Sequence, residues 1–205
     1  MRGLTSRLLA LTVPVVLLAT ACSGGAPAAP ASTPDRFAPT GAPVRLEPVE
    51  DADGEPVELA DGLSIVVPEG STSEPVTSQV EGAERVLYRM PDADADGIPS
   101  MQVSWQVEGQ VGALESTWAQ ETTMRTNPIS SDFERSAAQW PGARTAVVST
   151  WTEEVATDGE PVVVDALSLT VDTEDGASVV AVAVAPSGEL DDSSSLDALR
   201  TLTLG

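Results

Sequence analysis

The chain has 205 residues, with 32 acidic residues against ten arginines, neither lysine nor histidine, and a formal net charge of −22. The missing histidine excludes Ser-His and Cys-His nucleophile arrangements, and the missing lysine excludes Schiff-base chemistry. The excess of negative charge disfavours binding to nucleic acid, whose phosphates carry the same sign.

The first 22 residues, MRGLTSRLLALTVPVVLLATAC, have the parts of an export signal. Arg2 and Arg7 form a positive start, Leu8 to Leu18 are almost all apolar, and small residues follow. The apolar run is shorter than the roughly 20 residues of a membrane-spanning helix and contains Pro14. We therefore predict a signal peptide at residues 1–21, whose removal leaves eight arginines and a net charge of −24.

Cys22 is the only cysteine, so the folded part must be stable without a disulfide. The residues Ala19-Thr20-Ala21-Cys22, followed by Ser-Gly-Gly, resemble a bacterial lipobox, although leucine is usual where Ala19 stands. The resemblance implies lipidation of Cys22 and anchoring at the extracytoplasmic face of the cell membrane, where two acyl chains give a stable anchor. The alternative is an ordinary secretory signal with a chance cysteine.

Residues 22–45 are rich in alanine, proline, serine and glycine and poor in large apolar residues. Such a segment buries too little surface to offset the entropy lost on ordering, so we expect a flexible linker. The remaining residues, 46–205, are enough for one globular domain with a hydrophobic core.

Alternation of apolar and polar residues predicts half-buried antiparallel strands in the globular part. It is clearest in segments whose apolar faces are Leu63-Ile65-Val67, Met101-Val103-Trp105-Val107, Leu167-Leu169-Val171 and Val180-Val182-Val184. Further strands are expected at 85–90, 133–139 and 144–155. Asp-Gly pairs beginning at positions 53, 61, 96, 158 and 175 lie between apolar runs. They predict tight turns because both residues accept a positive φ.

Two segments are predicted to be helical. Residues 112–127 place Leu114 and Trp118 four apart, and Asn127 before a proline ends the pattern. The segment 191–202 has Ser193 or Ser194 as N-cap and an apolar stripe of Leu196, Leu199 and Leu202. Each helix then has one narrow apolar face for packing on a sheet. Because strands and helices do not alternate regularly, the order predicts an α+β fold.

The stretch DGLSIVVPEG at 61–70 resembles the first strand of PsbP-like domains, and the later order of elements is similar. Together with the lipobox, this resembles actinobacterial cell-envelope lipoproteins of the LpqN type, and the alanine-, valine- and aspartate-rich composition is typical of a GC-rich genome. Ser71 departs from the pattern, since an aromatic residue commonly follows the glycine. The resemblance implies an antiparallel sheet sandwiched by helices, and a non-enzymatic binding or accessory role at the envelope.

The segment PDADADGIPS places Asp92, Asp94 and Asp96 on alternate residues before Gly97, as in the first half of an EF-hand calcium loop. The twelfth position is Val103, however, where a bidentate glutamate is required, and the flanks read as strands. An acidic turn is therefore the preferred interpretation, and weak calcium binding stays an alternative. No other cofactor is expected.

Trp105, Trp118 and Trp151 fall on apolar faces and are expected in the core, whereas Trp140 precedes a Pro-Gly turn. We expect Trp140 to be partly exposed, so that it is a candidate for a partner surface, although core packing is still its preferred role. The preferred function is a lipid-anchored binding or accessory protein with an envelope protein or a lipid-like ligand as partner. The alternatives are a calcium-stabilised adhesion module and a small hydrolase that uses two carboxylates.

Overall fold

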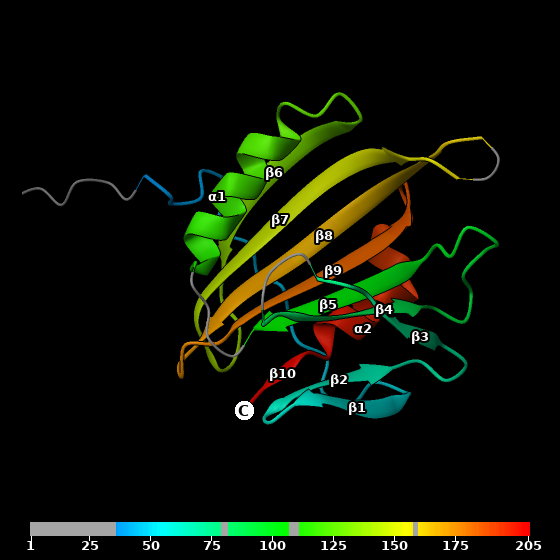
Figure 1. Cartoon of the computed structure of the whole chain (residues 1–205), viewed down its shortest axis with the longest axis horizontal. Helices are drawn as coiled ribbons and strands as arrows, with labels where there is room; N and C mark the ends of the chain where they lie inside the picture. The colour runs from blue at the N-terminus through cyan, green and yellow to red at the C-terminus, as the bar shows by residue number, and fades with distance from the viewer. Residues whose placement is uncertain (1–35, 79–81, 107–110, 158–159) are drawn as a thin grey trace, which may run out of the picture. The chain divides into compact units, whose positions relative to one another are not determined.

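The computed structural model describes residues 36–78, 82–106, 111–157 and 160–205. This part contains two antiparallel sheets and two α-helices, so the predicted α+β class is confirmed (Figure 1). The predicted signal peptide and Cys22 lie outside the described residues. The PsbP-like assignment stays a prediction.

The larger sheet has seven strands in the order β3-β4-β5-β9-β8-β7-β6. Their bounds are β3 (Thr72–Pro75), β4 (Glu84–Arg89), β5 (Ser100–Gln106), β6 (Ser130–Ala138), β7 (Ala143–Val155), β8 (Val162–Thr173) and β9 (Ser178–Pro186). All neighbouring strands pair antiparallel. The six longer strands lie where alternation and composition predict them, and β3, which has four exposed residues, had no such pattern.

The smaller sheet has three strands in the order β1-β2-β10. They are β1 (Glu55–Ala60), β2 (Leu63–Val67) and β10 (Thr203–Leu204). The two residues Asp61-Gly62 join β1 to β2, and Gly62 has a φ of +73°, which confirms the Asp-Gly turn predicted here. The apolar face of β2 is buried as predicted, because Leu63, Ile65 and Val67 enter the core.

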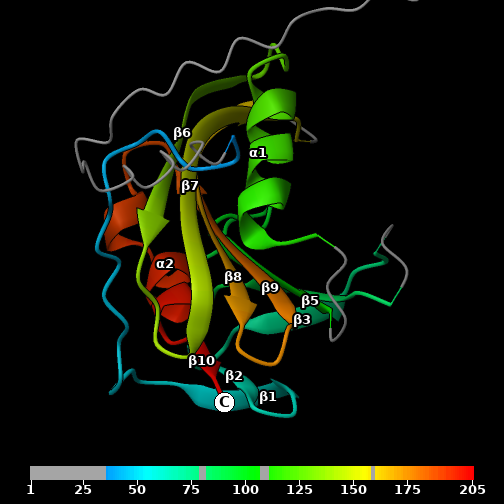
Figure 2. The same cartoon turned by 90° about the vertical axis from the view of Figure 1, so that its left-hand side faces the viewer.

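One helix packs on each face of the larger sheet (Figure 2). Helix α1 (Ala113–Met124) contacts β6, β7 and β8, and α2 (Ser194–Arg200), preceded by the short helix η1 (Leu190–Asp192), contacts β9, β5 and β2. Ser193 caps α2, since its Oγ accepts the N–H of Leu196 at 3.2 Å. The predicted stripe of Leu196, Leu199 and Leu202 is buried in the core. The sheet is thus sandwiched by helices, as expected.

The valines of β9 correct one expectation about this core. Val180, Val182 and Val184 share one face of β9, but this face is only partly buried. The opposite face enters the core and consists of Val179, Ala181, Ala183 and Ala185. Small alanine side chains let α2 lie close to the strand, so alternation identified the strand but assigned the larger side chains to the wrong side.

Two of the four tryptophans also differ from expectation. Trp118 is 42% exposed, because α1 turns Ala113 and Thr117 toward the sheet and leaves Trp118 against Phe37 at 5.4 Å. Trp140 is 5% exposed and belongs to the core cluster. The predicted exposure of Trp140 is therefore wrong. Trp105 and Trp151 are buried, as predicted.

Residues that we assigned to the linker contact the strand β6. Gly41 donates its N–H to the carbonyl of Arg135 at 2.8 Å, and Val44 donates to Ala137 at 3.0 Å and forms a parallel bridge with Ala138. These residues have ordinary linker composition, so only their tertiary contacts reveal that they are part of the fold.

Asp165 on β8 joins three segments through its carboxylate. It accepts hydrogen bonds from the Gly188 N–H at 2.7 Å, the Thr152 hydroxyl at 2.7 Å and the Ser187 hydroxyl at 3.1 Å. The bond from Gly188, followed by those from the two hydroxyls, lowers the pKa of Asp165 below its ordinary 3.8 despite some desolvation.

This lowered pKa predicts a pH-dependent contribution to stability. A carboxyl whose pKa is lower in the folded state stabilises the fold above its unfolded pKa, and the contribution is lost as the pH falls through the folded value. We expect Asp165→Asn to reduce the free energy of unfolding at pH 7, and the gap to wild type to shrink below pH 3.8. Urea unfolding at a series of pH values measures this, and a gap that does not change with pH would contradict it.

Candidate functional site

The α1 face of the larger sheet is only half covered. Helix α1 packs mainly over β6, β7 and β8, whereas in the described ranges its body does not lie over β4 and β5 (Figure 1). Under α1 the side chains are polar but buried, and they include Ser149, Ser168 and Thr170. The uncovered half is the part of the regular sheet that a ligand can reach.

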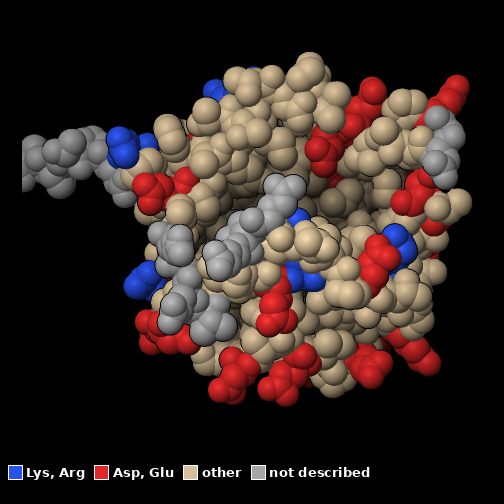
Figure 3. All heavy atoms as spheres, in the orientation of Figure 1, with Lys and Arg blue, Asp and Glu red and all other residues tan. Residues whose placement is uncertain are grey.

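A groove of about 420 Å³ lies along the border between α1 and this open half. That volume is within the range of pockets that bind small molecules. In the space-filling view the face is hollowed below α1, and acidic side chains lie along the lower margin of the view, over the smaller sheet (Figure 3). The groove is lined by Ala83, Arg85, Gln102, Ser104, Trp105, Gln106, Val111, Ser116, Ser178 and Val180.

Strand register explains how these side chains meet. Arg85 pairs with Ser104 on β5, and Ser104 pairs with Val180 on β9, so the three form one row across the floor. In the next row, Leu87 and Val182 flank Gln102. Successive side chains of a strand point to opposite faces of the sheet. Met101 and Val103 are fully buried in the core on one face, so the groove residues between them point to the other face. The floor is therefore rigid, and it combines one cation with amide, hydroxyl and apolar groups.

Helix α1, which forms the upper wall, is held by polar contacts at both ends. At its N-terminus both carboxylate oxygens of Asp172 accept the Ala113 N–H at 3.0 Å, which caps the helix from the neighbouring strand. Toward its C-terminus Arg135 Nε donates to Glu121 at 2.9 Å. Only Ala113 and Thr117 of α1 are buried, so these polar contacts are needed to hold the helix in its position on the sheet.

The aspartates Asp92, Asp94 and Asp96 lie in the turn between β4 and β5 and are exposed. Asp94 Oδ1 accepts the N–H of Asp96 at 2.9 Å and of Ile98 at 3.1 Å, and Asp92 accepts the Ser194 hydroxyl at 2.7 Å. Two of the three carboxylates thus stabilise the turn and tie it to α2. Within the described ranges no three acidic, histidine or cysteine side chains gather into an arrangement that holds a metal ion.

The sequence did not identify the groove. Trp140, the candidate for a partner surface, lies in the core, beside the segment Arg45–Pro48. The sequence feature that could have indicated the groove was the polar side of the predicted strand 101–107, where Gln102, Ser104 and Gln106 alternate with core residues. Alternation alone, however, does not distinguish a solvated face from a groove floor, because that depends on where α1 packs.

Neither α-helix in the described part of the chain has the length and apolarity needed to cross a membrane. No known family model matches the sequence, and no curated protein matches it. Solved structures similar to this one include a protein of Bacteroides thetaiotaomicron VPI-5482, with a TM-score of 0.41, 12% identity, and coverage of 75% of this chain and 49% of that one. The present chain therefore spans about half the length of the Bacteroides protein.

LpqN, described as involved in cell envelope biogenesis of Mycobacterium tuberculosis, is also similar in structure. Its TM-score is 0.38 at 16% identity, with coverage of 76% of this chain and 89% of LpqN. LpqN is thus among the structures that this chain is similar to. Both TM-scores lie below 0.5, so the functional proposal rests on the chain's own sequence and geometry.

Proposed function

We propose that this protein is a lipid-anchored, extracytoplasmic binding module of the cell envelope, without enzymatic activity, and that the groove beside α1 holds a lipid-like ligand. The observation that carries the proposal is the groove itself, where the apolar residues Val180 and Val111 lie beside polar groups. The lipobox-like sequence at Cys22 supports the anchor. An envelope role is compatible with the likeness to LpqN, on which nothing further depends.

A binding role suits the chemistry of the groove better than catalysis does. Catalysis by carboxylates requires two of them on either side of the reacting bond. The groove is lined by no aspartate or glutamate among the described residues, and its polar groups are amides, hydroxyls and one arginine. Such groups orient a bound molecule by hydrogen bonding and leave it unchanged.

Filling the groove tests the proposal in the full chain. Ser104→Trp adds a large side chain to the floor, on the strand face opposite the buried residues Met101 and Val103. We expect a small molecule that co-purifies with the membrane-bound wild type, detected by mass spectrometry of extracts, to be lost from Ser104→Trp. Asp197→Trp, on the exposed side of α2, is the matched control and should retain it. Identical extracts from wild type and Ser104→Trp would contradict the proposal.

The anchor has its own test. Intact-mass analysis of the purified protein should show a diacylglyceryl addition, and Cys22→Ala should leave the protein unprocessed or shed from the membrane. Unmodified wild-type protein that is released from cells would exclude the lipid anchor and leave the groove to be judged separately.

A further inference from the structure

Among the described residues, the guanidinium of Arg85 has no ion-pair partner, although the protein is strongly acidic. Arg89, on the same face of β4, is paired with Glu74 of β3 at 2.8 Å, and Arg125 and Arg135 both bind Glu121. At the level of Arg85 the segment after β3 offers Val76, whose N–H bonds the Arg85 carbonyl at 2.9 Å. Among the described residues, no carboxylate lies within ion-pair distance of Arg85.

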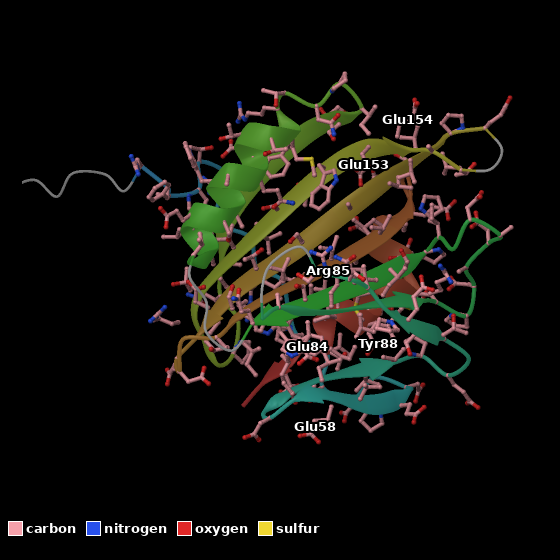
Figure 4. All side chains as sticks on the ribbon, in the orientation of Figure 1. Glu58, Glu84, Arg85, Tyr88, Glu153 and Glu154 are labelled. Carbon is pink, nitrogen blue, oxygen red and sulfur yellow. The ribbon has the colours of Figure 1, made fainter. Side chains whose placement is uncertain are left out.

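The Arg85 side chain is also partly desolvated. It is of intermediate exposure, and its Nε atom is buried without a hydrogen-bond partner among the described residues. A buried donor without an acceptor is costly, and the cost is greater when the group is charged. Figure 4 shows Arg85 over the open half of the sheet, whereas Glu84 and Tyr88 of the same strand lie on the side of the smaller sheet.

From this placement we infer that Arg85 binds the head group of the groove's ligand, and that the ligand is a single-chain amphiphile with one carboxylate. The inference rests on the proposed function. The flat guanidinium matches a carboxylate with two parallel hydrogen bonds. One arginine that has no ion pair among the described residues balances one negative charge, and Arg89, the neighbouring cation on this face, already pairs with Glu74.

The remaining groove residues fit the apolar chain of such a ligand. In the row that begins at Arg85, Val180 follows Ser104, and Val111, 48% exposed, lines the same groove. A chain that starts at Arg85 therefore runs across β5 and β9 toward α1. The protein's overall negative charge does not prevent this, because repulsion between exposed charges is screened beyond roughly 8 Å at physiological salt.

The test uses the full, lipid-anchored chain in zwitterionic phosphatidylcholine nanodiscs, with empty nanodiscs as the blank. Octanoate and octanamide share an apolar chain and differ in charge, and binding is followed by isothermal titration calorimetry. We expect Arg85→Gln to weaken octanoate binding at least tenfold and octanamide binding less than twofold. Arg85→Lys keeps the positive charge but cannot form the two parallel hydrogen bonds of a guanidinium. Its affinity for octanoate should lie between those of the wild type and Arg85→Gln.

Arg144→Gln is the matched control, because Arg144 is exposed, has no ion pair among the described residues and does not line the groove. It should leave octanoate binding unchanged, and a loss equal to that of Arg85→Gln would show a general charge effect and overturn the inference. The inference would also be overturned if the wild type bound octanoate and octanamide equally and Arg85→Gln weakened neither. The groove would then still be a ligand site. If neither probe binds the wild type, the proposed function fails and the inference fails with it.

Discussion

Replacing Arg135 by methionine should destabilise the protein by about 3 kcal/mol. Arg135 is 2% exposed and donates to the carboxylate of Glu121, the carbonyls of Phe37, Ala38 and Leu114, and the hydroxyl of Thr117. It therefore joins β6, α1 and the segment that precedes the globular part. Removing one partner of a buried ion pair typically costs about 3–5 kcal/mol, and we expect the lower end because Glu121 keeps its pair with Arg125.

Urea unfolding of the two proteins, followed by circular dichroism, measures the effect. Arg144→Met is the control, since Arg144 is exposed and surface substitutions usually change stability by less than about 0.5 kcal/mol. Adding Glu121→Gln to Arg135→Met should recover part of the loss, because it removes the charge behind Oε2, the carboxylate oxygen that loses its partner, while Arg125 binds Oε1. If Arg135→Met is as stable as the control, Arg135 does not hold α1 and the wall of the groove is positioned by other contacts.

Leu199→Ala should have an effect of similar size on the opposite face of the sheet. Leu199 is fully buried in the core cluster, where α2 packs on β9, β5 and β2. Truncation removes the transfer free energy of the lost methyl groups and leaves a cavity, which together cost about 2–5 kcal/mol. The groove lies on the other face, so its ligand binding should be unchanged once the protein is folded.

The matched control is Asp197→Ala on the same helix, where the side chain is 63% exposed and its ion pair with Arg200, at 3.6 Å, is weak. We expect it to change the free energy of unfolding by less than about 1 kcal/mol. Equal effects of the two substitutions would mean that α2 is not anchored by its leucine stripe.

How much the sequence revealed depends on the range of the interactions involved. Local patterns were sufficient for the longer strands, for the Ser193 cap and for the Asp61-Gly62 turn, because alternation, capping and turn chemistry act within a few residues. They also placed the leucines of α2 in the core. The strands β1, β3 and β10 were missed; β3 and β10 have only four and two residues, and β10 pairs with a segment distant in sequence.

The candidate site was not predictable for the same reason. Arg85 is distinguished by having no carboxylate partner among the described residues, and this depends on the segment after β3, which places Val76 beside it. Trp118 and Trp140 exchanged their expected environments, because α1 turns Ala113 and Thr117 toward the sheet and because Trp140 lies beside the segment Arg45–Pro48, which is far away in sequence. Spacing along the chain contains no information about either contact.

The groove as a ligand site is the central claim, and photoaffinity labelling tests it most directly. A diazirine placed on the chain of octanoate, crosslinked to the membrane-anchored wild-type protein and mapped by mass spectrometry, reports where the ligand lies. We predict labels in the segments 83–87, 102–106 and 178–182, competed away by excess octanoate and absent in Ser104→Trp. Labels that fall on α2 or on the smaller sheet, or that scatter over the surface without competition, would contradict the account.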